Sequence, residues 1–250
     1  MEPTQKITDP VAAAEASAKA VHDLSATFML DMDTYVQAAE AGYEGIAFYF
    51  CGRGGVLGDV GADEVAAAFV FFPPETVKAG WEGGAAVEDR QASATRFAEI
   101  GHDWAAAHLP EGAADYGRLA ELAGKIIGSA DAAAAPVFAG WRALPEPSDP
   151  RELVLHRMNA LRELRAARHG AAVKQVGLEP VDAFMVRTPY MAAIFGWPQP
   201  EGEPDEATKA QWAEAERLTN ESFARDLAVL SADELDEFCR LAEAVRTAAV

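Results

Sequence analysis

The sequence predicts an all-α protein built as a bundle of helices. Alanine is abundant, and the alternating β-branched runs typical of half-buried strands are almost absent. Proline and glycine divide the chain into segments of helical length. Apolar residues make up 50% of the 250 residues, which is enough for a substantial core and excludes general disorder.

The first half of the chain contains a series of segments with helical patterns. Residues 10–41 predict one or two helices ending at Gly42. The apolar run 46–51 suits a short helix or a buried strand, and the glycine-rich stretch 52–61 after it predicts a tight turn that uses the conformational freedom of glycine. Further helices are expected at 63–72, before Pro73 and Pro74, at 74–83, 87–109 and 113–127, and along the alanine-rich stretch to Leu144.

A long helix is predicted at 149–169. Asp149 suits its N-cap, Pro150 its first helical position and Glu152 its third, in a capping-box arrangement, and Gly170 suits its end. Three short segments follow at 171–176, 180–187 and 189–195. They are compatible with a helix-turn-helix-like unit, and equally with many helical bundles.

The C-terminal part is predicted to be a linker followed by two helices. Residues 196–206 have the composition of a linker, and acidic helices are expected at 206–229 and 231–248. Pro145, Pro147 and Pro150 interrupt the chain near its middle, so the helices also group into two packed halves. These would be residues 1–145, with the glycine-rich turn, and residues 146–250.

The charge of the chain limits its partners. The formal net charge is −19, from 21 basic and 40 acidic residues, so a phosphate backbone would be repelled at long range and nucleic acid is not favoured. One basic island remains at 151–187, with seven basic and four acidic residues. There is no signal pattern, no apolar run of about 20 residues, and only two cysteines, so we expect a cytoplasmic protein without a membrane partner. The sequence leaves open whether the chain forms a homo-oligomer.

The long helix carries positive charge along one stripe. Leu155, Met158, Arg162, Arg165 and His169 follow one another at spacings of 3, 4, 3 and 4, so they share a face. Like charges at these spacings repel unless water or anions compensate them. The stripe therefore predicts a cationic wall for an anionic or carbonyl ligand, with His169 able to donate a hydrogen bond or to titrate. Alternatively, the three residues pair with carboxylates of neighbouring helices.

Other faces of the same helix are assigned by their chemistry. The apolar face, expected to meet the core, consists of Leu153, Val154, Leu161 and Leu164. A separate polar face, expected to be solvated, consists of Glu152, His156, Asn159 and Glu163. The basic residues flank the apolar face, which predicts that they are partly buried.

Arg53 is the second candidate binding residue. It follows three aromatic residues inside the glycine-rich stretch, where it could hold an anion or form a buried structural ion pair. The stretch does not fit a phosphate-binding loop, because its glycine spacing is wrong and no Lys-Ser/Thr pair follows. No metal is predicted, since His102 and His108 point about 120° apart on a helix. Aromatic residues that suit either the core or a pocket wall are Phe69, Phe71, Phe72, Trp81, Trp104, Trp141 and Tyr190.

Two groups of residues also resemble a known family pattern. The first is 49–58 with 65–74, and the second is 141–145 and 149–150 with 161–169, after which Gly177 and Leu178 follow. Together they are similar to an actinobacterial family labelled SalK-like or EvbL-like helix-turn-helix proteins, over roughly residues 25–195. The resemblance implies a helix-turn-helix fold and highlights Arg53, Gly58, Arg162, Arg165 and His169.

The sequence departs from that family pattern in two places. Residues 166–168 replace a glycine-containing turn before His169, and the last fifty residues lack a winged-helix hairpin, which does not favour DNA binding.

Three functions are consistent with the sequence. The first is a small-molecule-binding protein, either a ligand-responsive regulator or an accessory protein of a biosynthetic pathway, with Arg53, Arg162, Arg165 and His169 in its pocket. The second is an enzyme with His169 as general acid or base and arginines that stabilise an oxyanion. The third is a DNA-binding regulator that uses the basic island. No cofactor can be named from the residues.

Overall fold

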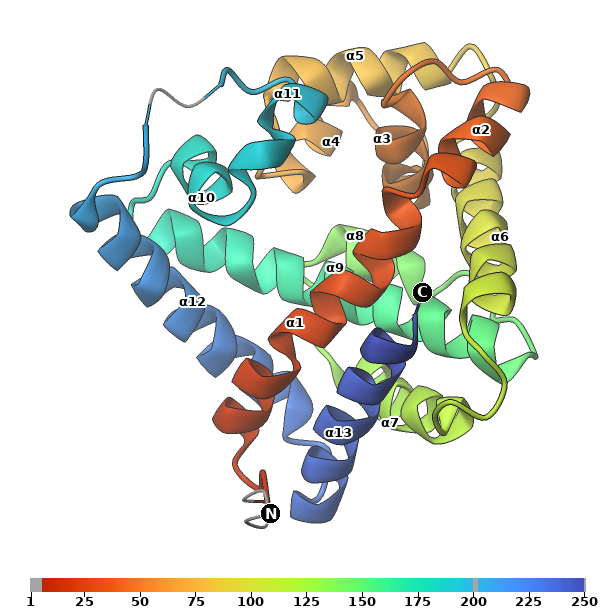
Figure 1. Ribbon diagram of the computed structural model, residues 1–250. Coiled ribbons are helices and arrows are strands. Elements are labelled where there is room, and N and C mark those ends of the chain that lie inside the picture. Colours follow the sequence, from red (N-terminus) through yellow and green to blue (C-terminus); the bar gives the residue numbers. More distant parts are fainter. Residues whose placement is uncertain (1–5, 200–201, 250) are drawn as a thin grey trace.

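The computed structural model describes residues 6–199 and 202–249. Within those ranges it contains thirteen α-helices, two 3-10 turns and no β-strand, which confirms the all-α prediction (Figure 1). The α-helices are α1 (Pro10–Met29), α2 (Met32–Glu40), α3 (Ala47–Gly54), α4 (Ala62–Ala68), α5 (Pro74–Gly84), α6 (Arg90–His108), α7 (Tyr116–Ser129), α8 (Pro136–Trp141), α9 (Pro150–Gln175), α10 (Pro180–Arg187), α11 (Ala192–Phe195), α12 (Glu206–Leu227) and α13 (Ala232–Ala248). The 3-10 turns are η1 (Gly55–Leu57) and η2 (Pro189–Met191).

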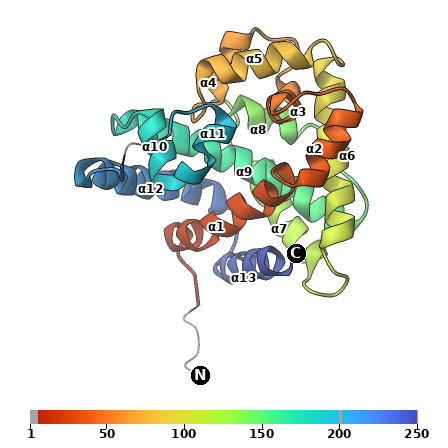
Figure 2. The same cartoon turned by 45° about the horizontal axis from the view of Figure 1, so that its top comes forward.

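Helix α9 is the central element of the bundle. It packs against α1, α6, α7, α8 and α12, and α1 crosses it in Figure 1. In the view turned by 45°, α9 again lies in the middle of the molecule, between α12 and α6 (Figure 2). Asp149 is its N-cap and Pro150 its first residue, as predicted, but the Asp149 side chain accepts a hydrogen bond from the Arg151 amide and the expected capping box with Glu152 does not form. A helix packed on so many sides buries polar positions as well as apolar ones.

The end of α9 corrects the sequence interpretation. Gly170 does not stop the helix, which continues to Gln175, so 171–176 is not a separate segment. Gly170 instead lets Val70 approach, because a Cβ there would lie 3.2 Å from Val70 Cγ2. Gly177 follows the C-cap residue Val176 with a φ of 68° that suits glycine, and the Leu178 amide donates back to the Val173 carbonyl. A short turn then leads into α10, as in a helix-turn-helix connection.

The glycine-rich stretch is also different from the prediction. Residues 47–54 are helical, which resolves the choice between helix and strand, and Arg53 lies in the last turn of α3. Within 52–61 only Gly58 has a positive φ, so the expected tight turn is wrong for most of these glycines. They are needed for close packing: a Cβ on Gly52 would lie 2.3 Å from the Phe97 ring, and one on Gly55 would lie 2.2 Å from the Arg90 carbonyl.

Residues 10–41 form two helices, which resolves the choice between one and two, because Asp31 caps the second one. Two other boundaries differ from expectation. The helix expected at 63–72 already ends at Ala68. The alanine-rich stretch is extended at Ala130 and becomes helical only from Pro136, so α8 is short.

The core draws on both parts of the chain. One hydrophobic cluster includes buried residues from Ala13 to Val245, and a smaller one consists of Ala172, Val173, Leu178, Ala183 and Ala215. Residues on both sides of Pro145 therefore contribute to the main cluster, while the division at 145 stays a prediction. Among the described residues, no helix combines the length and the apolar character needed to cross a membrane.

The close approach of α3 and α6 generates a stability prediction. We expect Gly52→Ala to destabilise the protein by about 2–4 kcal/mol, because the added methyl group must displace the Phe97 ring in a close-packed core. Gly83→Ala in α5 is the matched control, since nothing lies within 4 Å of its added Cβ, and it should be neutral or stabilise by up to about 1 kcal/mol. Urea unfolding measures both; equal effects would contradict the packing argument.

Candidate functional site

Arg53 and Arg162 meet at one buried carboxylate. Arg53 donates from Nε and Nη2 to the two oxygens of Glu163, each at 2.9 Å, and Arg162 donates from Nη1 to Glu163 Oε1 at 2.9 Å. Glu163 is only 3% exposed, so its expected position on a solvated face is wrong. The structure thus brings two of the predicted cations together from α3 and α9, around an anion of the protein itself.

Arg53 is held on every edge by protein groups. Its Nη1 donates to the Tyr49 hydroxyl at 2.7 Å, and its guanidinium lies 4.5 Å from the centre of the Phe69 ring. The Trp141 indole also donates to the Arg53 carbonyl. Burial alone would lower the pKa of Arg53. Glu163 and Tyr49 outweigh this effect and raise the pKa above its ordinary value, so the side chain stays cationic. The structure therefore favours the alternative of a buried structural ion pair for Arg53.

The charge state of Glu163 follows from its two partners. Burial disfavours the carboxylate and raises the pKa, but Arg53 and Arg162 outweigh this and hold the pKa of Glu163 below its usual value. Glu163 is thus an anion at neutral pH. Two guanidinium groups share this single negative charge, so one positive charge remains in the interior.

Arg165 and His169 form a second cluster against α12. Arg165 Nη2 donates to Glu216 at 3.0 Å and to Asn220 at 3.2 Å. His169 Nδ1 lies 2.9 Å from Thr219 Oγ1 and 3.3 Å from Glu216 Oε1. The imidazole stacks on Phe71, with ring centres 5.1 Å apart, and Trp212 meets it edge-on. The four predicted site residues thus lie in two clusters: Arg53 of α3 with Arg162, and Arg165 with His169 one turn further along α9.

His22 of α1 and Arg187 of α10 belong to the same region. Burial lowers the pKa of His22, and Arg162 and Arg187 lower it further, against an opposing effect of Asp23. Neither residue belongs to the arginine and histidine stripe of α9. Arg187 lies in the basic island and could have been found there, whereas nothing in the sequence distinguishes His22.

The pKa of His169 links the two clusters. The pKa of His169 is lowered to about 4, mainly by burial and also by Arg165, Arg187 and His22, whereas Glu216 opposes the shift. Titratable or charged groups from α1, α9 and α10 are therefore close enough to act on the same imidazole. His169 is neutral at pH 7.

The region carries an excess of positive charge. The guanidinium groups of Arg53, Arg162 and Arg165 pair with the two carboxylates of Glu163 and Glu216, which leaves one positive charge when the histidines are neutral, and Arg187 lies exposed at the edge of the region. This contrasts with the chain as a whole, whose net charge is −19. In the described part of the chain, the buried Nε atoms of Arg162 and Arg165 have no hydrogen-bond partner. A buried donor without a partner costs about 1–3 kcal/mol, which a bound acceptor would recover.

The rest of the basic island is used within the fold. Arg151 pairs with Asp149, Arg157 with Glu146, and Arg168 with Asp226. Among the described residues of this island, Lys174 and Arg187 are the two cations without an ion pair. The island is therefore mainly internal and does not present a continuous basic face.

A third polar cluster lies on the α9 face that was expected to be solvated. His156 is 4% and Asn159 1% exposed, so that expectation is wrong, because α6 and α8 pack over this face. His102 Nε2 lies 3.1 Å from His156 Nδ1. Burial lowers the pKa of both, that of His156 to about 4. No group of three or more metal-binding side chains occurs among the residues that the structure describes.

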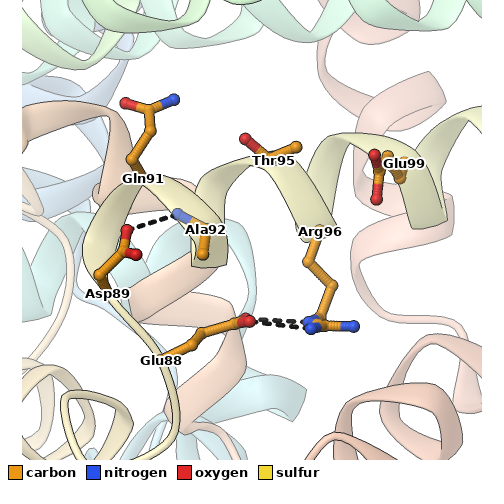
Figure 3. A pocket seen from close by; sticks show the side chains of 7 residues that line it. All are labelled: Glu88, Asp89, Gln91, Ala92, Thr95, Arg96 and Glu99. Atoms are coloured by element: carbon orange, nitrogen blue, oxygen red, sulfur yellow. Dashed lines mark hydrogen bonds and ion pairs between the residues drawn. The ribbon is translucent and has the colours of Figure 1, made fainter.

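A hollow on the surface of α6 does not involve the cationic region. It is lined by Glu88, Asp89, Gln91, Ala92, Thr95, Arg96 and Glu99 (Figure 3). Two hydrogen bonds from Arg96 to Glu88, at 2.9 and 2.8 Å, already satisfy its only cation. The hollow therefore lacks free positive charge, and its chemistry differs from that of the α9 clusters.

Comparison with known proteins identifies the family. A model described as a helix-turn-helix family matches residues 14–250. The chain therefore belongs to this helix-turn-helix family. Searches of curated proteins and of solved structures gave no significant match.

The buried ion pair generates a second stability prediction. Glu163→Gln should destabilise the protein by about 3–5 kcal/mol, because it leaves two buried guanidinium groups without a countercharge. Glu146→Gln is the control: Glu146 also binds an arginine through both oxygens, but it is 43% exposed, so its loss should cost less than about 1 kcal/mol. Chemical denaturation compares the two, and similar losses would show that Glu163 is not a central contact.

The buried histidines predict a loss of stability in mild acid. The pKa values of His156 and His169 fall from 6.5 to about 4 on folding, so below pH 6.5 the unfolded chain binds more protons than the folded one. Their contribution is complete above pH 6.5 and is lost as the pH falls toward 4, by about 2 kcal/mol per histidine at pH 5. Urea unfolding between pH 8 and pH 5 measures this slope. His156→Gln should reduce it, and an unchanged slope would refute the assignment.

Proposed function

We propose that this helix-turn-helix family protein binds an anionic small molecule at the α9 clusters. We further propose that it acts as a ligand-responsive regulator or as an accessory protein of a biosynthetic pathway. The observation that carries the proposal is the excess of positive charge where Arg53, Arg162 and Arg165 meet only two carboxylates, in a chain with a net charge of −19. Charge of one sign in a partly dry site attracts a ligand of the other sign.

The free edge of Arg162 gives the ligand a defined partner. Arg162 uses Nη1 for Glu163, whereas Nε is buried without a partner in the described residues. The edge formed by Nε and Nη2 is the one with which Arg53 binds both oxygens of Glu163. The same two-point geometry suits a carboxylate of a ligand. Phe71 and Trp212, which contact His169, supply apolar surface for its remainder.

Binding is favoured over acid–base catalysis by the pKa of His169. A general acid or base works best with a pKa near the working pH. With a pKa of about 4, about one molecule in a thousand carries the imidazolium form at pH 7. The enzymatic alternative would therefore require the ligand itself to raise this pKa.

The ion pairs of the basic island also weaken the hypothesis that the protein binds nucleic acid. Most arginines of the basic island already have partners inside the protein, which weakens the hypothesis of a DNA-binding face at 151–187. We propose that a regulatory role would act through the ligand-dependent shape of the bundle. The finer relationship to SalK-like or EvbL-like proteins belongs to this proposal as well.

Ligand-induced thermal shifts test the proposed function. We expect aromatic and aliphatic carboxylates to raise the melting temperature of the wild type. Arg162→Gln should weaken the affinity at least tenfold and so reduce this rise. Arg168→Gln is the matched control, because Arg168 lies on the same helix, is 16% exposed against 12% for Arg162, and pairs with Asp226. Equal shifts for both variants, or no shift for the wild type, would contradict the proposal.

A further inference from the structure

Exposed apolar side chains gather around one short helix. Seven large apolar side chains are exposed among the described residues, and three of them, Leu30, Met32 and Val36, lie within seven consecutive positions. Met32 is 74% and Val36 52% exposed. They lie four positions apart on α2, so they share one solvent-facing stripe of that helix. Single exposed apolar residues are ordinary, whereas a grouped stripe is typical of a surface that contacts a partner.

An acidic groove runs beside this apolar stripe. The hollow of Figure 3 continues into a second one, because Arg96 and Glu99 of α6 line both, and Glu40 and Asp103 line the second. The groove therefore lies between α2 and α6, which are neighbours in both ribbon views (Figure 1 and Figure 2). Glu40 follows Val36 by four positions, which is about 40° around the helix axis. The groove thus adjoins the stripe.

The groove is strongly negative. Five carboxylates line its two parts, against the single guanidinium group of Arg96. Arg96 binds both oxygens of Glu88, and Glu99 lies apart from that pair in Figure 3. Glu40, Glu99 and Asp103 thus have no ion-pair partner in the part of the chain that the structure describes. Unpaired carboxylates along a groove attract lysine and arginine side chains of a partner.

The stripe and the groove together limit what can bind here. An apolar stripe alone would suit a membrane or a second copy of this chain. The carboxylates repel anionic lipid headgroups, and a symmetric dimer through this face would bring the same carboxylates together. An extended peptide pairs its backbone with the edge of a sheet, and the described residues form no strand. A helix satisfies its own backbone and can dock through side chains alone.

We infer that the α2–α6 face, formed by Met32, Val36, Glu40, Glu99 and Asp103, docks a basic amphipathic helix of a partner protein. The apolar side chains of that helix cover the stripe, and its lysines or arginines enter the groove. The flexible methionine side chain adapts to different apolar partners, which suits such a contact. The face shares no residue with the α9 clusters, so the inference is independent of the proposed function.

Binding of a designed peptide to the full-length protein tests the inference. The probe is an amphipathic peptide of about 18 residues with leucines on one face and lysines beside them. One control peptide is a scrambled sequence of the same composition, and the other carries glutamates in place of the lysines. We expect the probe to bind and both controls to bind at least about tenfold more weakly. Fluorescence anisotropy measures the affinities, and that of the probe should fall as salt is added.

A pair of double variants tests the apolar stripe. Met32→Ser with Val36→Ser should weaken binding of the probe by about tenfold. Ile194→Ser with Val229→Ser is the matched control, because it removes exposed apolar side chains that lie elsewhere, and it should leave the affinity unchanged. All four side chains are exposed, so the melting temperature should stay near that of the wild type.

A second pair of double variants tests the groove. Glu40→Gln with Glu99→Gln should weaken binding of the probe and reduce its salt dependence, because two of the attracting charges are lost. Glu15→Gln with Glu111→Gln removes the same charge from exposed positions outside the groove and should have a smaller effect.

Two results would overturn the inference. One is the absence of probe binding by the wild type, or equal weakening by the face variants and their controls. The other is self-association of the wild type that Met32→Ser with Val36→Ser abolishes, because the face would then join two copies of the chain. Sedimentation velocity of the protein without peptide makes this distinction, and we expect no such self-association.

Discussion

The ionised Glu163 side chain is the constraint on which the rest of the interior depends. A carboxylate that is 3% exposed is stable only beside positive charge, and Arg53 and Arg162 supply it from two different helices. Arg53 is in turn fixed by Tyr49, Phe69 and the indole of Trp141. The position of α3 against α9 is thus defined by one charged contact as well as by apolar packing. Because two cations share one anion, the same contact leaves a net positive charge in the interior.

The central position of α9 explains how polar chemistry becomes buried in this fold. Five helices pack around it, so every face of the helix contributes to the interior. His156, Asn159 and Glu163 follow one another on one side, and Arg162, Arg165 and His169 on another. The first group meets α3, α6 and α8, whereas the second meets α1, α10 and α12. One helix therefore carries both a structural charge network and the candidate ligand site.

Local signals in the sequence account for much of the fold. Caps at Asp149 and Ser231 and the proline positions define where helices begin, and these depend on neighbouring residues alone. The same reasoning failed at Gly52, Gly55 and Gly170, where glycine serves close packing and not a special backbone conformation. Local sequence cannot distinguish these two uses, because the second depends on Phe97, Arg90 and Val70, which are distant in the chain.

The sequence by itself determined the helical class, most helix starts and the arginine stripe of α9, because these follow from propensity, capping and periodicity within a few residues. Tertiary structure alone decided that Glu163 is buried between Arg53 and Arg162, and that His22 and Arg187 join the region. It also decided that His169 is buried against Thr219 and Glu216 of another helix. The physical reason is that burial and charge pairing depend on the packing of whole helices, and residues more than a hundred positions apart set them.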